Sequence, residues 1–245
     1  MHAKLLLNQH FSFDDLVITN APNSLVLDGA TKEKLAGIWQ QVEADAQAAG
    51  KKVWDGLTYR MNQFSVQDSK LHLELAEMPF SMRRSLETLQ EKEGENEAWM
   101  PNGVAVSPLV QTCDGKFLFG KLSGTTMSTR VYGTFGGIVD RHIGSGEELW
   151  AMFLTEMHEE ANIQERDVVQ KSIEGIVRSK RGVAIIVAHV QIALSAEEAT
   201  CKFAEREDDE MSEMIAVDVQ EIESHPIFSD YTETWGRIVT RITTK

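Results

Sequence analysis

The chain has 245 residues, 42% of them hydrophobic, and its 24 lysines and arginines are outnumbered by 38 aspartates and glutamates, which gives a formal net charge of −14. This length and composition allow a packed core and favour two domains. The negative charge argues against nucleic acid or an anionic membrane as the main partner, because both would repel the protein.

Cysteine usage and the N-terminus favour a soluble protein of the cytoplasm. Cys113 and Cys201 are too few for a disulfide scaffold and lack the paired spacing of a zinc site, so we expect free thiols. The three leucines after Lys4 are too short for the apolar core of a signal peptide. No apolar run approaches the roughly 18 residues of a membrane-spanning helix.

Residues 1–95 are predicted to form a smaller N-terminal α+β domain. The β-rich runs LVITN and SLVLD flank the turn signal Ala21-Pro22-Asn23 and predict a strand pair. Apolar residues at helical spacing predict a helix over 31–49, which Gly50 can end in a left-handed conformation. Residues 53–78 then alternate between apolar and polar, which predicts strands.

Turn and charge signals divide the rest of the chain. Asp55-Gly56 and Gln67-Asp68-Ser69 are expected turns within the alternating stretch. The charged run 89–97 has the composition of an exposed connection, so we place the domain boundary near residue 95. Residues 96–245 are then the second and larger domain.

The larger domain reads as strands, helix, strands, helix. Asp114-Gly115 predicts a β-hairpin, and VYGTFGGIVD predicts a strand that enters a glycine turn. Two further strands are expected on either side of Gly182, and MIAVDVQEI predicts another. Asp230 and Glu233 can form a capping box for a last helix, whose Ile238 and Val239 would face the core.

The stretch 132–163 joins a glycine turn to the most informative helix. Ser145 and Glu148 fit a capping box, so the helix should begin near Gly146. At about 100° per residue, three glutamates share one face, beside an apolar arc that can be buried. These glutamates are Glu156, Glu159 and Glu160.

Three like charges this close repel one another unless a cation lies between them. A hard divalent ion such as Mg²⁺ prefers carboxylate oxygens, so this helix face is a candidate metal site. The alternative is an acidic face that only contacts solvent, which is the commoner role of a charge run.

The same residues resemble the Nudix box, G-x5-E-x7-R-E-U-x-E-E-x-G-U with U aliphatic. The matching positions are Glu147, Glu156, Met157, Glu159, Glu160 and Ile163. Thr155 replaces the box arginine, Asn162 replaces the late glycine, and nine residues rather than five separate Gly137 from Glu147. We interpret the longer spacing as a four-residue insertion in a surface loop, which is tolerated at little cost.

This resemblance implies a Nudix α/β/α sandwich preceded by the smaller α+β domain. It also implies a hydrolase that uses Mg²⁺, or Mn²⁺, held by Glu156, Glu159 and Glu160. In the family the box arginine orients the catalytic glutamates, and threonine supplies neither its charge nor its reach. The second hypothesis is therefore a Nudix-fold module that binds nucleotides or regulates without catalysis.

The resemblance also suggests a substrate, the diphosphate of a nucleoside diphosphate linked to a second group. Gly56, Tyr59 and Arg60 fit the G-x-x-(Y/F)-R motif found before the box in Nudix proteins related to UDP-glucose pyrophosphatase. A nucleotide sugar is therefore the first expectation, and an ADP-ribose-like compound is the second. We expect the N-terminal unit, with Trp54, to contribute to the substrate pocket or to a homodimer interface.

Further site residues are expected around the glutamates. Nudix enzymes often place one more glutamate, a metal ligand or general base, where residues 207–213 lie here, and Glu210 is our candidate. Lys180 and Arg181, with Arg178, bring cations to a hairpin tip and are candidates for phosphate contact. The alternative is a basic tip that balances surface charge.

Arg130 and Tyr132 precede the glycine turn and are candidates for contact with the substrate. Ordinary strand packing is the alternative role for both residues.

Overall fold

The computed structural model describes residues 3–50, 53–123, 132–222 and 232–244. The larger sheet consists of β1 (Lys4–Phe11), β5 (Val104–Gln111), β6 (Phe117–Leu122), β7 (Tyr132–Gly133), β8 (Val168–Arg178), β9 (Ala184–Ile192) and β10 (Met211–Val217). The smaller sheet consists of β2 (Leu16–Asn20), β3 (Leu57–Gln67) and β4 (Lys70–Pro79). The α-helices are α1 (Gly29–Ala48), α2 (Phe80–Glu93), α3 (Gly146–Ala161), α4 (Ala196–Ala204) and α5 (Thr232–Thr243).

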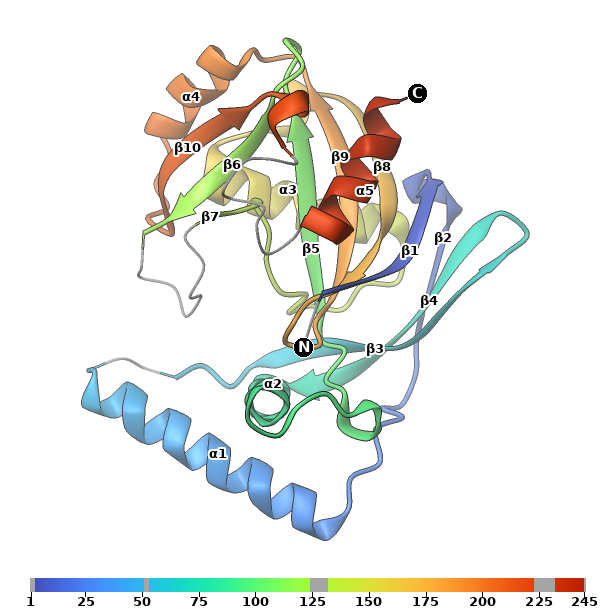
Figure 1. Ribbon diagram of the computed structural model, residues 1–245, viewed down its shortest axis with the longest axis vertical. Helices are drawn as coiled ribbons and strands as arrows, with labels where there is room; N and C mark the ends of the chain where they lie inside the picture. The colour runs from blue at the N-terminus through green and yellow to red at the C-terminus, as the bar shows by residue number, and fades with distance from the viewer. Residues whose placement is uncertain (1–2, 51–52, 124–131, 223–231, 245) are drawn as a thin grey trace.

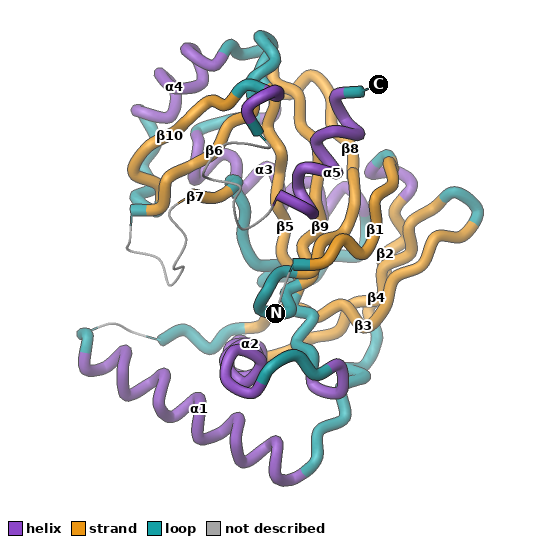
Figure 2. The backbone as a smooth tube through the Cα atoms, in the orientation of Figure 1, coloured by secondary structure: helices purple, strands orange, loops and turns teal. Residues whose placement is uncertain are grey.

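Helices cover both faces of the larger sheet. Its strands run in the order β1-β8-β9-β5-β6-β10, with β7 paired to β6. Figure 1 shows α5 in front of the sheet and α3 behind it, and Figure 2 shows the helices on either side of the strands. Phe153 and Met157 bury one face, while Ile238 and Val239 bury the other. The predicted mixed α/β sandwich is therefore confirmed. Among the described residues, no helix is both long and apolar enough to cross a membrane.

The helix α3 begins and ends where local signals place it. The Ser145 hydroxyl accepts a hydrogen bond from the Glu148 backbone N–H at 3.1 Å. The Glu148 carboxylate accepts from the Gly144 N–H at 2.6 Å instead of from its own cap residue, so the predicted capping box is only half formed. The helix ends at Asn162, whose φ of 55° is left-handed.

The loop before α3 is anchored by two buried residues, while Asp140, Arg141, His142 and Gly144 are exposed, as expected of a surface insertion. Val139 and Ile143 are fully buried. The Val139 carbonyl accepts from the Tyr59 N–H at 3.2 Å, and the Ile143 carbonyl accepts from the Asn20 side chain at 2.9 Å. The loop therefore packs against the smaller sheet, and the N-terminal strands help to hold the segment that leads into α3.

The smaller sheet contains one predicted hairpin and one unpredicted pairing. The strands β3 and β4 pair antiparallel around Asp68 and Ser69, as expected. The predicted pairing of LVITN with SLVLD is wrong, because β2 pairs in parallel with β4. SLVLD is not a strand: Leu25 and Leu27 pack with α1 and α2, and Asp28 caps α1 through the Thr31 N–H at 2.6 Å. The predicted helix before Gly50 is confirmed as α1.

The charged run at 89–97 is also corrected, because its first half belongs to α2. Leu89 and Gln90 are buried there, and Leu86 is the deepest apolar contact of the helix. The predicted boundary near residue 95 does not separate the two sheets either. The strand β1 pairs antiparallel with β8, and so residues 4–11 lie in the larger sheet.

Most of the remaining elements of the larger unit lie where the sequence analysis predicts them. The hairpins β5–β6 and β8–β9 turn at Gly115 and Gly182, which have φ values of 87° and 80°. The strand β10 and the helix α5 are present as predicted. The expected strand VYGTFGGIVD is reduced to β7, the pair Tyr132–Gly133. The helix α4 was not expected, and the proposed cap Asp230 lies outside the described residues.

Candidate functional site

Four glutamates and two aspartates gather at the glycine turn between β7 and α3. A cavity of about 440 Å³ is bounded by this turn, by α3 and by the segment before β10. Its lining is acidic apart from the turn and one aromatic ring. The residues are Trp54, Gly136, Gly137, Ile138, Asp140, Glu156, Glu159, Glu160, Asp208 and Glu210. The carboxylates predicted from sequence therefore border one cavity.

The absence of side chains at the glycine turn brings the helix carboxylates close to the backbone. A Cβ on Gly137 would lie 2.2 Å from a Glu156 carboxylate oxygen. A Cβ on Gly136 would lie 2.2 Å from the Val106 carbonyl oxygen of β5. The Val106 N–H donates to the Gly137 carbonyl at 2.9 Å, which fixes the turn on the sheet. At Gly136 the contact is with backbone, so only glycine fits there, whereas a side chain at Gly137 would displace the Glu156 carboxylate from its position.

The carboxylates raise one another's pKa because they are buried beside like charges. Burial, followed by the charges of Glu156 and Glu210, raises the pKa of Glu160 to about 9. Burial, followed by Glu159 and Glu210, raises the pKa of Glu156 to about 7. Burial and then Asp208 raise the pKa of Glu210. The buried carboxylates therefore favour a positively charged ligand in the acidic cavity.

One oxygen of Glu160 has no protein partner. Glu160 is 5% exposed, and its Oε2 atom is buried without a hydrogen-bond partner. The Gly136 N–H donates to the same carboxylate. A buried carboxylate oxygen without a donor is costly, and a cation is one group that can satisfy it.

The donor set suits a hard divalent cation, although the side chains are spread around the cavity. Among residues 3–50, 53–123, 132–222 and 232–244, no three acidic, histidine or cysteine side chains are close enough together to hold a metal ion. Oxygen donors of this number and charge are nevertheless the ligands that Mg²⁺ and Mn²⁺ prefer. Glu156, Glu160 and Glu210 are the residues that would hold such an ion, with the exposed Glu159 at the rim.

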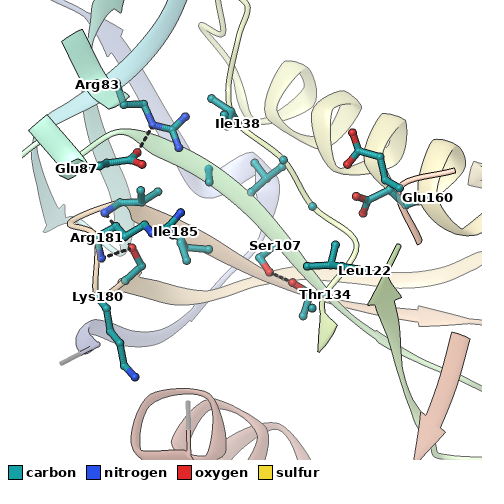
Figure 3. A pocket seen from close by; sticks show the side chains of 18 of the residues that line it. Arg83, Glu87, Ser107, Leu122, Thr134, Ile138, Glu160, Lys180, Arg181 and Ile185 are labelled. Carbon is teal, nitrogen blue, oxygen red and sulfur yellow. Dashed lines mark hydrogen bonds and ion pairs between the residues drawn. The ribbon is translucent and has the colours of Figure 1, made fainter. Parts of the chain in front are cut away.

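A second cavity of about 380 Å³ continues from the first toward a cationic end. The two cavities share Gly136, Gly137, Ile138, Glu160 and Glu210. Figure 3 shows Glu160 at one end, Lys180 and Arg181 at the other, and Ser107 hydrogen-bonded to Thr134 between them. A molecule bound here would contact carboxylates and cations at once.

The β8–β9 turn holds its cations through bonds to other elements. Ser179 is buried, and its hydroxyl accepts from the backbone N–H groups of Arg181 and Val183 at 3.2 and 3.1 Å. The Arg181 guanidinium lies 2.7 Å from Glu91 of α2. Arg178 lies 2.7 Å from Glu97 and is absent from the described lining of both cavities. Lys180 and Arg181 are thus placed at the cavity, whereas Arg178 ties β8 to the segment after α2.

Two predicted substrate contacts cannot be placed in this way. Arg130 lies outside the described residues, and of Tyr132 only the backbone in β7 is described. From the N-terminal unit, Trp54 lines the acidic cavity, whereas Tyr59 and Arg60 are buried.

Sequence reasoning missed the contribution of α2. Arg83 and Glu87 line the cationic end, 2.7 Å apart, and both are buried. Arg83 and Glu87 are spaced at i and i+4, which would have marked a helical ion pair had α2 been expected. Asp140 was also missed, and no local pattern distinguishes it from other acidic loop residues; Asp208 belongs to the acidic stretch 207–213 from which Glu210 was chosen.

The two substituted box positions differ in their consequences. Asn162 adopts the left-handed conformation that favours glycine, and asparagine is the residue that most readily replaces glycine there. Its side chain also donates to the Lys202 carbonyl at 3.0 Å. Thr155 donates its hydroxyl to the Ala151 carbonyl at 2.9 Å within α3, so it performs no task of an arginine.

Solved structures with a similar fold include a mutT/nudix family protein from Listeria innocua, with a TM-score of 0.42 and 18% identity over 58% of this chain and 95% of that one. A NUDIX hydrolase from Nitrosomonas europaea aligns with a TM-score of 0.40 and 11% identity over 58% and 90% of the two chains. A MutT protein from Methanosarcina mazei Go1 aligns with a TM-score of 0.37 and 17% identity over 58% and 96%. The chain resembles Nudix proteins.

The function of the chain is inferred from the residues of its site. No protein-family model matches the chain, and no curated protein sequence matches it.

Proposed function

We propose that the protein is a metal-dependent hydrolase of the Nudix type. The substrate would be a nucleoside diphosphate linked to a second group, with a nucleotide sugar as the first candidate. The observation that carries this proposal is the shared cavity. Glu156, Glu159 and Glu160, which match the box, border it together with Glu210, and it continues to Lys180 and Arg181.

The protein's own groups suit hydrolysis of a diphosphate. Water would attack one phosphorus atom, the bond from that phosphorus to the bridging oxygen would break, and a nucleoside monophosphate and the phosphorylated second group would leave. Glu160 or Glu210 would accept the proton of the attacking water. Lys180 and Arg181 would neutralise the charge that develops on the phosphate oxygens.

A divalent cation would add what the side chains lack. Bound by the glutamates, Mg²⁺ or Mn²⁺ supplies charge for the phosphate oxygens and makes water a better nucleophile. The excess of negative charge around Glu160 supports this requirement, because no cationic side chain is among the described residues lining the acidic cavity.

A second candidate function is supported by Thr155. In the Nudix box this position holds an arginine that orients the catalytic glutamates, and here a hydroxyl bonded within the helix replaces it. A protein that binds a nucleotide and metal without turnover would fit this change. Asn162 does not add to this argument, because its backbone keeps the left-handed turn.

The deciding experiment measures product formation from nucleotide sugars and dinucleotides with Mg²⁺ or Mn²⁺, and measures binding of the same compounds. Hydrolysis that requires the metal and is lost in Glu160→Gln would support the enzyme. Tight binding without hydrolysis of any compound would support the binding module. If neither hydrolysis nor binding is found for any compound, both proposals are wrong.

A further inference from the structure

Arg83 reaches the cavity from a helix that precedes the stretch 132–163, where the resemblance to the Nudix box lies. It belongs to α2, which follows the smaller sheet, and its side chain is 7% exposed. Gly103 makes room for it: a Cβ there would lie 2.7 Å from the Arg83 Nε atom and 2.8 Å from its Cδ atom. Figure 3 shows the guanidinium beside Glu87, near Ile138. The charged side chain of Arg83 is therefore buried at the cationic end of the second cavity.

The bonds of Arg83 are incomplete. Its Nε atom donates to Glu87 at 2.7 Å, which fixes the plane of the guanidinium. Its Nη1 atom is buried and has no hydrogen-bond partner. A charged donor that is buried without an acceptor is strongly unfavourable. An oxygen atom of a molecule bound in the cavity would satisfy this N–H group.

The charges at this end favour an anion. Arg83, Lys180 and Arg181 are the cations that line it, and Glu87 is the acidic residue beside them among the described lining. Glu160 lies at the opposite end (Figure 3), where it lines the acidic cavity together with Glu210. Glu87 is also approached by Arg84 at 3.5 Å, so its charge is shared between two arginines. A guanidinium held in a fixed plane suits the oxygens of a phosphate or a carboxylate.

We propose that Arg83 binds an anionic oxygen group of the substrate, a phosphate or a carboxylate, at the end of the cavity opposite the glutamates. Two sources have this chemistry: one phosphate of the diphosphate itself, or an additional acidic group on the part of the substrate beyond it. The inference rests on the proposed function only for the molecule that carries the group. Arg83 would then be a specificity residue that the N-terminal unit supplies to the site.

The first test uses inorganic phosphate and the full-length, metal-free protein, so it does not depend on hydrolysis. Calorimetric titration should show binding to the wild type, weakened about tenfold or more in Arg83→Met, because one charge-assisted hydrogen bond is lost. Lys92→Met removes an exposed cation from the same helix, is the matched control and should bind phosphate like the wild type. Absent phosphate binding in the wild type, or equal binding by Arg83→Met, would overturn the proposal.

Two further measurements keep the test decisive. If Arg83→Met does not fold, the double variant Arg83→Met/Glu87→Met removes both members of the buried pair and is judged by the same criterion.

The KM of a nucleoside diphosphate sugar is then compared with that of the matching sugar acid. A rise for both substrates in the Arg83 variant assigns Arg83 to the diphosphate, and a rise for the sugar acid alone assigns it to the additional carboxylate. Unchanged KM values for both would contradict the inference, whereas phosphate binding that depends on Arg83 without any hydrolysis would refute the proposed activity alone.

Discussion

At the scale of single residues, Asn162 shows how a departure from a motif can keep the geometry of the motif. Its backbone is left-handed, and its side chain bonds to the Lys202 carbonyl of α4. Asn162→Ala should lower the free energy of unfolding by about 1–2 kcal/mol, because alanine is strained in this conformation. The melting temperature should fall by about 2–4 °C for each kcal/mol. Asn162→Gly removes the side-chain hydrogen bond but keeps the left-handed conformation, so it should lower the free energy of unfolding by less. An equal decrease in the alanine and glycine variants would contradict this account.

The glutamates of α3 should affect activity and stability in opposite directions. Glu160→Gln keeps the shape of the side chain and replaces a buried carboxyl beside Glu156 and Glu210, whose pKa of about 9 keeps it protonated at neutral pH in the metal-free protein. Activity should fall on the order of a thousandfold or more, because a ligand that acts in the transition state is lost. Above about pH 9, where Glu160 carries its charge, the metal-free variant should melt at a higher temperature than the wild type. Glu159→Gln, at the exposed rim, should lose comparable activity and change the melting temperature less, since exposed like charges on one helix cost a few tenths of a kcal/mol.

The measurement pairs thermal melts, with and without Mg²⁺, with the hydrolysis assay on the wild type and both variants. A wild type that gains no stability from Mg²⁺, together with variants that melt and hydrolyse as it does, would reduce the acidic face to a solvated surface. The proposed chemistry would then be lost while the fold remained.

At the scale of elements, the β8–β9 turn and α2 form one cationic end of the cavity. Replacing both Lys180 and Arg181 by alanine should raise KM more than it lowers kcat, provided that they hold the ground state and the transition state alike. This double change also breaks the bond between Arg181 and Glu91. Glu91→Ala is therefore the matched control, because it breaks the same bond and keeps both cations. An equal rise of KM in Glu91→Ala would mean that the turn is positioned by α2 and does not itself bind phosphate.

The elements that the sequence predicts correctly have their signals within a few residues of chain. The helix α3 has Ser145 before it, an apolar stripe along it and a left-handed residue after it. The hairpin β3–β4 has a polar turn between two alternating runs. The helix α2 lacks such a signal, since Pro79 precedes it without a side-chain cap and its last turn is highly charged. The helix α4 did carry one, the reciprocal capping box of Ser195 and Glu198.

The strand pairings that decide the architecture join segments far apart in the chain. The local pattern of apolar and polar residues does not show which strand pairs with which. LVITN alternates as well beside β4 as it would beside SLVLD, and only the structure shows which partner it takes. The same limit applies to the site. Glu156, Glu159 and Glu160 were found because one helix turn brings them together, whereas Arg83 lines the opposite end of the adjoining cavity from a helix more than 60 residues earlier in the chain.

At the scale of the whole molecule, Glu174 connects β1 and α5, from opposite ends of the chain, to β8 of the larger sheet. It lies in β8 and is 3% exposed. It accepts from Ser172 at 2.6 Å, bonds to His10 of β1 at 2.8 Å and lies 2.7 Å from Arg241 of α5. Arg241 also donates to Asn8 at 2.8 Å. This network explains why β1 belongs to the larger sheet although it precedes the whole N-terminal unit.

The Glu174 network makes stability depend on pH in a direction that can be worked out. Burial raises the pKa of Glu174, but hydrogen bonds from Ser172 and His10 and the charge of Arg241 outweigh burial, so its pKa lies below the ordinary value of a glutamate. A carboxyl whose pKa is lowered by folding stabilises the folded state fully above its unfolded pKa and loses that contribution as the pH falls through the folded value. Glu174→Gln should therefore lower the free energy of unfolding at pH 7 by about 1–3 kcal/mol, the typical contribution of hydrogen bonds to a charged group.

The difference in the free energy of unfolding between the wild type and Glu174→Gln is predicted to stay constant from neutral pH down to about pH 5. It should become smaller below the ordinary pKa of a carboxyl group. Urea unfolding at a series of pH values measures this gap directly. Glu43→Gln, at an exposed position of α1, is the matched control and should follow the wild type throughout. A gap that persists unchanged well below pH 4 would show that the bonds around Glu174 stabilise the fold without regard to its charge. In that case shape, rather than ionisation, would be what joins β1 and α5 to the sheet.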